Sequence, residues 1–227
     1  MAYRSTASEG AVKRKTRSKR SKIPWNKGKR VGQKLPLSLQ QIRSIRSRLT
    51  KDQQVRELAL FDLAIDSSLK PFDLIRLRVV DLGRGGRLLQ QLNITAPASK
   101  RRSSFALSPE TRASVAAWIN HQGLKASDYL FPSRLHASPY LSARQYARLV
   151  ESWVSSIGLN PRDYGTHSLR RTKPALIYRK TKDLAAAQLL LGNTKLESTE
   201  RYLGSMWNKA FTPTGRRRGR SKLRGTR

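Results

Sequence analysis

Hydrophobic residues at helical spacing mark where the ordered part of the chain begins. From Leu39 to Leu49 they recur every three or four positions, and Ser38 directly before them suits a helix N-cap. The next stretch, from about residue 52 to 65, is apolar on most sides, which indicates a helix at the centre of a core. Pro71 then suits the first turn of a short helix.

A second group of helices is predicted in the C-terminal half. Ser108 and Pro109 suit the start of a helix that ends near residue 122. Apolar residues on one face predict another helix over residues 142–158. Residues 166–204 are then expected to form a helical hairpin whose two ends face each other.

The stretch between these two groups has the pattern of β-structure. Short apolar runs at residues 77–82, 86–95 and 103–108 are separated by glycines and a proline, which predicts three antiparallel strands. The expected fold is therefore a mainly helical α+β domain over residues 36–204, with a small three-stranded antiparallel sheet.

The two ends of the chain differ from this middle part in composition. Residues 1–35 and 205–227 are rich in basic residues and offer little to bury, so we expect a disordered basic arm and a basic Arg/Gly-rich tail. They carry eleven and eight of the 33 net positive charges. The predicted domain between them is thus basic in its own right.

This charge favours a polyanionic partner, because each phosphate that is neutralised releases condensed counterions. Nucleic acid fits better than a membrane, since no run of about 18 apolar residues exists. The chain has no cysteine and no apolar leader, and His121 and His136 have no metal-ligand spacing. We expect a cytoplasmic, nucleoid-associated protein with no cofactor, no metal, no membrane contact and no small-molecule substrate.

His167, Arg170 and Tyr202 fall within the predicted hairpin. His167 and Arg170 are three positions apart and so share a helix face. Taken alone, such a pair is usually a solvated face, and a single tyrosine is usually a half-buried anchor. Together, the three residue types are those that bind and attack a phosphate.

Order and spacing strengthen the functional interpretation. The chain reads HSLR at 167–170, LGN at 191–193 and STERYLG around Tyr202. This resembles the tyrosine recombinase or phage integrase family, whose signature is His-x-x-Arg, then Leu-Gly-His, then a tyrosine about ten residues later. Residues 58–82 and 87–107 also look like that family's first catalytic segment and its hairpin, so the resemblance covers most of residues 36–204.

The resemblance implies a defined chemistry. Arg170 and a cation at position 70 would grip the scissile phosphate of DNA, and Tyr202 would attack the phosphorus to give a 3′-phosphotyrosyl link. His167 and a lysine of the hairpin would move the protons. The family's reaction also implies double-stranded DNA as partner and four protomers on two duplexes. The basic side chains expected to contact DNA around this group are Arg171, Lys100, Arg101, Arg102, Lys27, Lys29 and Arg30.

Several positions depart from the family pattern. The first arginine is Lys70, which keeps the charge but loses the planar fork, and the second histidine is Asn193, which donates a hydrogen bond but does not titrate. The hairpin lysine falls on Ala98. Lys100, two residues on, is the replacement we consider, because alternate residues of a strand share a face. Pro174 is expected to distort the helix beside Arg170.

These departures leave two main hypotheses open. One is an active recombinase that cuts and rejoins DNA through Tyr202. The other is a catalytically impaired relative that acts as a DNA-binding module. A general RNA-binding basic protein would account for the tails but for nothing between them.

Overall fold

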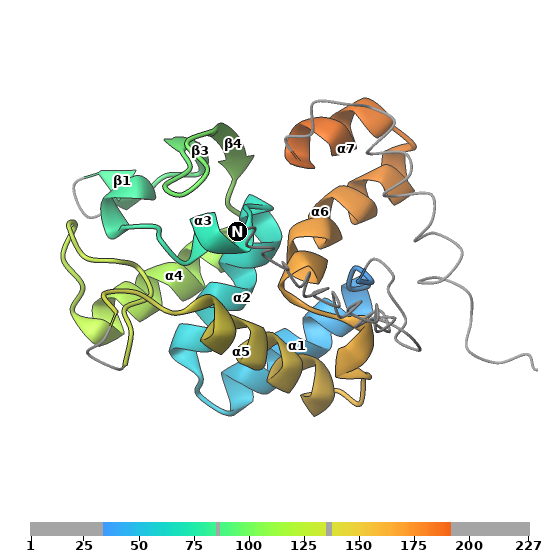
Figure 1. Cartoon of the computed structure of the whole chain (residues 1–227), viewed down its shortest axis with the longest axis horizontal. Coiled ribbons are helices and arrows are strands. Elements are labelled where there is room, and N and C mark those ends of the chain that lie inside the picture. The colour runs from blue at the N-terminus through green and yellow to red at the C-terminus, as the bar shows by residue number, and fades with distance from the viewer. Residues whose placement is uncertain (1–33, 85–86, 135–137, 192–227) are drawn as a thin grey trace, which may run out of the picture. The chain divides into compact units, whose positions relative to one another are not determined.

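The computed structural model describes residues 34–84, 87–134 and 138–191, shown in colour in Figure 1. The longer helices are α1 (Leu39–Lys51), α2 (Val55–Ser67), α4 (Pro109–Gln122), α5 (Ala143–Ser156), α6 (Thr166–Thr181) and α7 (Leu184–Leu191). The short elements are helix α3 (Pro71–Leu74), the 3-10 turns η1 (Val79–Asp81) and η2 (Pro161–Asp163), and strands β1 (Gly83–Arg84), β2 (Arg87–Leu88), β3 (Gln91–Thr95) and β4 (Arg102–Ala106). The predicted mainly helical α+β class is confirmed.

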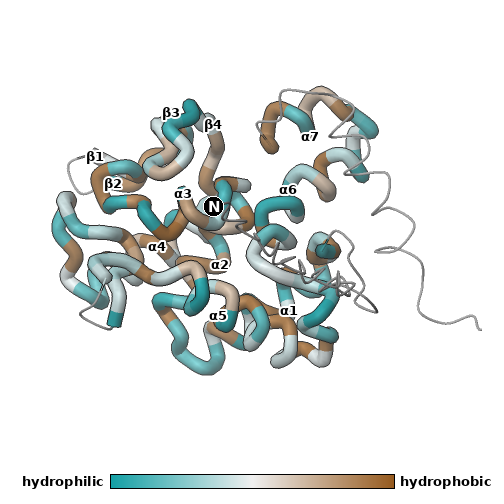
Figure 2. Tube along the Cα trace, in the orientation of Figure 1, coloured by the Kyte–Doolittle hydropathy of each residue, from teal (hydrophilic) through white to brown (hydrophobic). Residues whose placement is uncertain are grey.

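Helix starts follow the predicted caps. The Ser38 hydroxyl accepts a hydrogen bond from the Gln41 amide at 3.2 Å, and the Gln41 side chain accepts one from the Ser38 amide at 2.8 Å. This reciprocal pair satisfies two amides that the first turn of a helix leaves unpaired. The Ser108 hydroxyl likewise caps α4 by accepting from the Thr111 amide. Figure 2 shows the alternation of hydrophilic and hydrophobic positions along α1 and α5.

Helix α2 lies at the centre of this arrangement, as its sequence predicts. Nine consecutive residues, Ala59 to Ser67, are buried, and the helix packs against α1, α4 and α6 (Figure 1). The Phe61 and Trp153 rings meet edge to face with centroids 5.5 Å apart. Because the C-terminal end of α2 is fixed on several sides, the loop that follows it is held in a defined place.

The predicted three-stranded sheet is wrong in its number of strands. The structure has two separate two-stranded antiparallel ladders, β1 with β2 and β3 with β4. Residues 79–81 form a 3-10 turn instead of a strand, because the Asp81 carboxylate accepts from the Arg78 amide at 2.7 Å. This local bond ends the extended backbone, leaving Arg78 with one isolated bridge to Tyr129.

Helix α6 continues through Pro174, whose side chain is buried. The proline therefore does not end the helix that carries His167 and Arg170. Helix α7 packs back on α6, with Ala175 and Ala187 buried between them. Within the part of the chain that the structure describes, no helix is long and apolar enough to cross a membrane.

Candidate functional site

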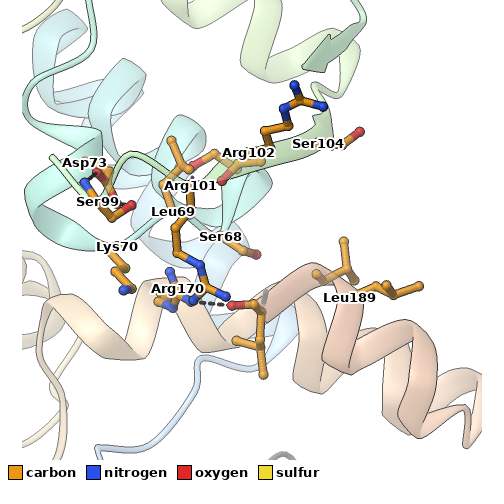
Figure 3. A pocket seen from close by; sticks show the side chains of 14 residues that line it. Ser68, Leu69, Lys70, Asp73, Ser99, Arg101, Arg102, Ser104, Arg170 and Leu189 are labelled. Atoms are coloured by element: carbon orange, nitrogen blue, oxygen red, sulfur yellow. Dashed lines mark hydrogen bonds between the residues drawn. The ribbon is translucent and has the colours of Figure 1, made fainter. Parts of the chain in front are cut away.

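A cavity of about 400 Å³ opens where five elements meet. Its walls come from the end of α2 and the start of α3, from the β3–β4 hairpin, and from α6 and the end of α7 (Figure 3). Segments a hundred residues apart in sequence thus form one hollow. Only the packing of α6 and the hairpin around α2 brings them together.

Four of the five charged residues that line this cavity are basic. Lys70, Arg101, Arg102 and Arg170 all line it. Figure 3 shows Lys70 and Arg101 extending toward Arg170, whereas Arg102 is directed away from it. Lys70, Arg101 and Arg102 make no ion pair with any carboxylate of the described residues. The convergence of Lys70 and Arg101 on Arg170 creates a positive potential that an anion would relieve.

The acid at the cavity, Asp73, is already engaged. Its Oδ1 accepts from the amides of Ala98 and Ser99 at 2.9 and 2.7 Å, and its Oδ2 accepts from the Ser99 hydroxyl at 2.8 Å. Asp73 is 2% exposed. Three hydrogen bonds to a carboxylate fix the hairpin turn against α3, immediately beside Lys70. The Asp73 carboxylate therefore fixes the hairpin turn beside Lys70 and forms no ion pair with it.

Arg170 joins α6 to the end of α7. Its Nη2 donates to the backbone carbonyl of Leu191, the last described residue of α7 (Figure 3). Arg170 is half-buried, so part of its guanidinium surface borders the cavity. The predicted phosphate-binding arginine and Lys70 are thus on opposite walls of one cavity.

His167 lies one turn before Arg170 on α6. The residue is exposed, and the described residues that line the cavity do not include it. Partial burial of the ring, with Arg171 and Arg170 nearby, holds the pKa of His167 below its usual value. The imidazole is therefore neutral at pH 7 and able to accept a proton.

Two further predicted residues lie apart from the cavity. Lys100 is exposed in the hairpin turn with a φ of 56°, between β3 and β4 rather than within a strand. Strand alternation therefore does not relate it to Ala98, and the hairpin residues at the cavity are Ser99, Arg101 and Arg102. Arg171 is half-buried, and its Nη1 donates to the carbonyl of Lys34 at 3.0 Å, which ties α6 to the start of the described chain.

The remaining predicted residues lie outside the described part of the chain. They are Tyr202, Asn193, Lys27, Lys29 and Arg30. Among the described residues, no three or more histidines and carboxylates are grouped so that they could hold a metal ion. The ring of His121 lies 6.3 Å from that of Trp118, an aromatic contact.

The sequence gives a partial signal for one further residue at the cavity, Asp73. Asp73 follows Lys70 by three positions, the spacing of neighbours on a helix, but its hydrogen bonds to residues 98 and 99 are tertiary. Lys173, with contacts to both Asp66 and Ala106, gave no such signal.

The fold of the chain is similar to that of solved site-specific recombinases and integrases. The chain aligns with a XerH site-specific recombinase bound to its difH substrate at a TM-score of 0.61 and 19% identity, over 75% of this chain and 51% of that one. An integrase of the transposon Tn1549, solved with a circular intermediate DNA, aligns at a TM-score of 0.59 and 17% identity, over 76% and 62%. Both likenesses concern the fold.

Residues 36–208 match the model of the phage integrase family, and the chain belongs to that family. A probable integrase/recombinase YoeC of Bacillus subtilis is 27% identical over 167 residues, which is 74% of this chain and 87% of that protein. The tyrosine recombinase XerD of Rickettsia conorii is also 27% identical, over 185 residues. That match covers 74% of this chain but only 60% of XerD.

Proposed function

We propose that this protein cuts and rejoins double-stranded DNA as a site-specific recombinase of the tyrosine type. The observation that carries the proposal is the convergence of Lys70, Arg101 and Arg170 on one cavity. Such a group of cations suits a single phosphate held between two walls of protein. Family membership makes a DNA backbone the natural source of that phosphate.

The proposed step is a transesterification. The Tyr202 oxygen attacks the scissile phosphorus, a 3′-phosphotyrosyl bond forms, and the bond to the 5′-oxygen breaks. The tyrosine proton passes to a base, for which neutral His167 is suited, and the departing 5′-oxygen takes up a proton. Since one phosphodiester replaces another, rejoining needs no external energy source.

The two phosphate-binding cations differ in what they contribute. Arg170 offers a planar fork that matches two phosphate oxygens. Lys70 offers one compact charge on a flexible stem, so it attracts the phosphate but orients it less well. We therefore expect Lys70→Arg to raise the rate of cleavage.

Chain connectivity is compatible with a tyrosine at this cavity. Leu191 lines the cavity, and Asn193 and Tyr202 follow it after two and eleven residues. Eleven residues span up to roughly 38 Å when extended, which exceeds the size of the cavity. Asn193 would supply a hydrogen bond to the phosphate from the same side.

The hairpin offers two cations for the role of the family's lysine, Lys100 and Arg101. We retain Lys100 as a DNA contact at the turn, where it is exposed. Arg101 borders the cavity itself. Comparison of Lys100→Ala with Arg101→Ala would separate the two roles, since loss of the phosphate contact slows cleavage and loss of a peripheral contact weakens binding only.

The test is covalent capture on a nicked suicide duplex that carries the recognition site. Wild-type protein should form a complex that survives denaturation, and Tyr202→Phe should form none while it binds DNA with unchanged affinity. The proposal would be abandoned if Tyr202→Phe formed as much covalent complex as the wild type.

A second candidate function is a DNA-binding module without turnover. Lys70, Ala98, Asn193 and Pro174 occurring together favour it. In that case wild-type protein would form no covalent complex, whereas Lys70→Arg would recover some. Capture by the wild type alone would eliminate this alternative.

The proposed function also implies an arrangement of domains along the chain and an assembly of protomers on DNA. A catalytic domain over residues 36–204 is flanked by basic segments at 1–35 and 205–227, in which Lys27, Lys29 and Arg30 contact phosphates without reading sequence. Four protomers would assemble on two duplexes. Analytical ultracentrifugation with and without a two-site DNA tests that stoichiometry.

A further inference from the structure

Lys173 links three parts of the protein whose neighbouring residues line the cavity. Its Nζ donates to the Asp66 carbonyl at 3.0 Å, to the Asp66 carboxylate Oδ1 at 3.3 Å and to the Ala106 carbonyl at 3.0 Å. All three donors of the ammonium group are thus used. One side chain of α6 is bonded to the end of α2 and to the end of β4.

The second carboxylate oxygen of Asp66 is bonded to the start of α4. Its Oδ2 accepts from the Ser108 amide and from the Thr111 hydroxyl, each at 2.7 Å. The side chains of Lys173 and Asp66 are 23% and 11% exposed. Burial alone would raise the pKa of Asp66, but these hydrogen bonds and the charge of Lys173 outweigh it and lower the pKa. The carboxylate is therefore ionised and fully bonded.

These contacts join the segments that carry the two walls of the cavity. Asp66 precedes Ser67, Ser68, Leu69 and Lys70, which line one wall, and Ala106 ends the strand that carries Arg102. Lys173 is three residues after Arg170, which lines the other wall. Residues three apart on a helix share a face. The bonds of Lys173 therefore fix the position of α6 along and around its axis, and with it the position of Arg170.

We infer that Lys173 is a positioning residue: it sets the spacing between Arg170 on α6 and the opposite wall formed by Lys70 and the hairpin. This inference rests on the proposed function for its catalytic consequence, but the geometric part stands without it. A phosphate clamp built from two walls depends on their separation, and a displacement of about 1 Å can cost about 100-fold in rate.

The test compares Lys173→Met with Lys180→Met, the same change at an exposed lysine of the same helix. Lys173→Met should slow covalent capture by about 100-fold while DNA affinity stays within about twofold, because every other basic residue of the chain is unchanged. Lys180→Met should cleave like the wild type. Lys173→Arg, which keeps charge and donors, should recover part of the rate. Unchanged cleavage by Lys173→Met would overturn the inference.

Loss of stability needs its own control, because Lys173→Met leaves Asp66 without its counter-charge. The double variant Lys173→Met with Asp66→Leu replaces the pair by apolar groups, which often restores stability. If the double variant is as stable as the wild type and still slow, positioning is supported. If its cleavage returns with its stability, the pair has only a structural role.

A readout independent of cleavage separates this inference from the proposed function. In Lys173→Met, backbone amides of residues 67–69 and 98–104 should exchange hydrogen about tenfold faster than in the wild type, with those of α1 unchanged. Equal acceleration throughout the domain, or none, would overturn the inference. A wild type that forms no covalent complex would overturn the proposed function and leave this result in force.

Discussion

The buried acids of α2 and the basic cavity at its end differ in whether their charged side chains have partners within the protein. Asp62 accepts from Arg46 at 2.6 Å and from Ser114 at 2.9 Å, and Asp66 is bonded on both sides. At the cavity, Lys70 and Arg101 have no carboxylate partner among the described residues. The acids Asp62 and Asp66 connect elements of the fold, whereas the cations Lys70 and Arg101 are available to a ligand.

This difference has a physical reason. A carboxylate accepts several hydrogen bonds from amides and hydroxyls, so it can join loops and helix starts within a protein. A cation that faces an open cavity keeps its hydration until a phosphate replaces the water. With 47 basic and 14 acidic residues, the chain has many more cations than acids to neutralise them. Substitutions at the cavity should therefore mainly affect cleavage, and substitutions of the buried acids should mainly affect stability.

The largest effect is expected at the cavity. Arg170→Ala should lower the rate of covalent capture by about 100- to 1,000-fold, because a donor aimed at the developing phosphate charge is lost. Arg170→Lys, which keeps the charge without the planar fork, should give a rate of covalent capture between those of Arg170→Ala and the wild type. Cleavage by Arg170→Ala at the wild-type rate would show that the cavity does not bind the reacting phosphate.

On the acidic side, Asp66→Ala should destabilise the domain by about 3 kcal/mol, because Ser108, Thr111 and Lys173 all lose an acceptor. Asp52→Ala is the matched control. Its ion pair with Arg48 is exposed, so we expect a change below about 1 kcal/mol. Chemical denaturation measures both, and equal values would refute the proposed division between structural acids and open cations.

Asp73 lies at the boundary between the two regions. Asp73→Ala leaves two hairpin amides and a hydroxyl without their acceptor, which should cost about 2 kcal/mol in stability. It should also slow cleavage about tenfold, because the hairpin beside Lys70 is no longer fixed. Asp81→Ala, which removes a single exposed bond to the Arg78 amide, should leave cleavage unchanged.

The smallest effect concerns His167. Because its pKa is lowered in the folded protein, the folded state resists protonation. Stability should therefore decline as the pH falls through the ordinary histidine pKa of about 6.5, and this decline should be smaller in His167→Asn. Thermal melts at several pH values measure the difference.

Bound DNA should shift the pKa of His167 in the opposite direction. A phosphate beside the ring raises the pKa of His167, which a proton NMR titration of the three histidines would detect with a non-cleavable duplex. A pKa that does not move on DNA binding would place His167 away from the phosphate.

Local signals in the sequence predicted much of the fold. Ser38 and Ser108 cap the helices expected of them, and the apolar stretch that became α2 is the centre of the core. The order of HSLR, LGN and Tyr202 indicated the family that the comparisons then showed. Such features depend on residues close together in the chain, so periodicity and spacing report them directly.

The sequence was less informative where a local bond competes with an extended pattern. Residues 77–82 form a short apolar run that suggested a strand, but Asp81 bonds back to Arg78 and turns the chain. Lys100 adopts a positive φ in the hairpin turn, so the alternation of side chains along a strand does not apply to it. Arg171, expected to contact DNA, also donates to the Lys34 carbonyl, a contact between distant residues that the sequence did not indicate.

By itself, then, the sequence determined the helices, the buried centre at α2, the excess of cations and the family to which the chain belongs. Only the tertiary structure decided which cations converge: Arg101 rather than Lys100 borders the cavity with Lys70 and Arg170. It also showed that Lys173 bonds α6 to the end of β4 and that Asp73 bonds α3 to the hairpin turn. The reason is that these contacts join residues 25 to 107 positions apart, and their partners are chosen by packing around α2, not by neighbours in the chain.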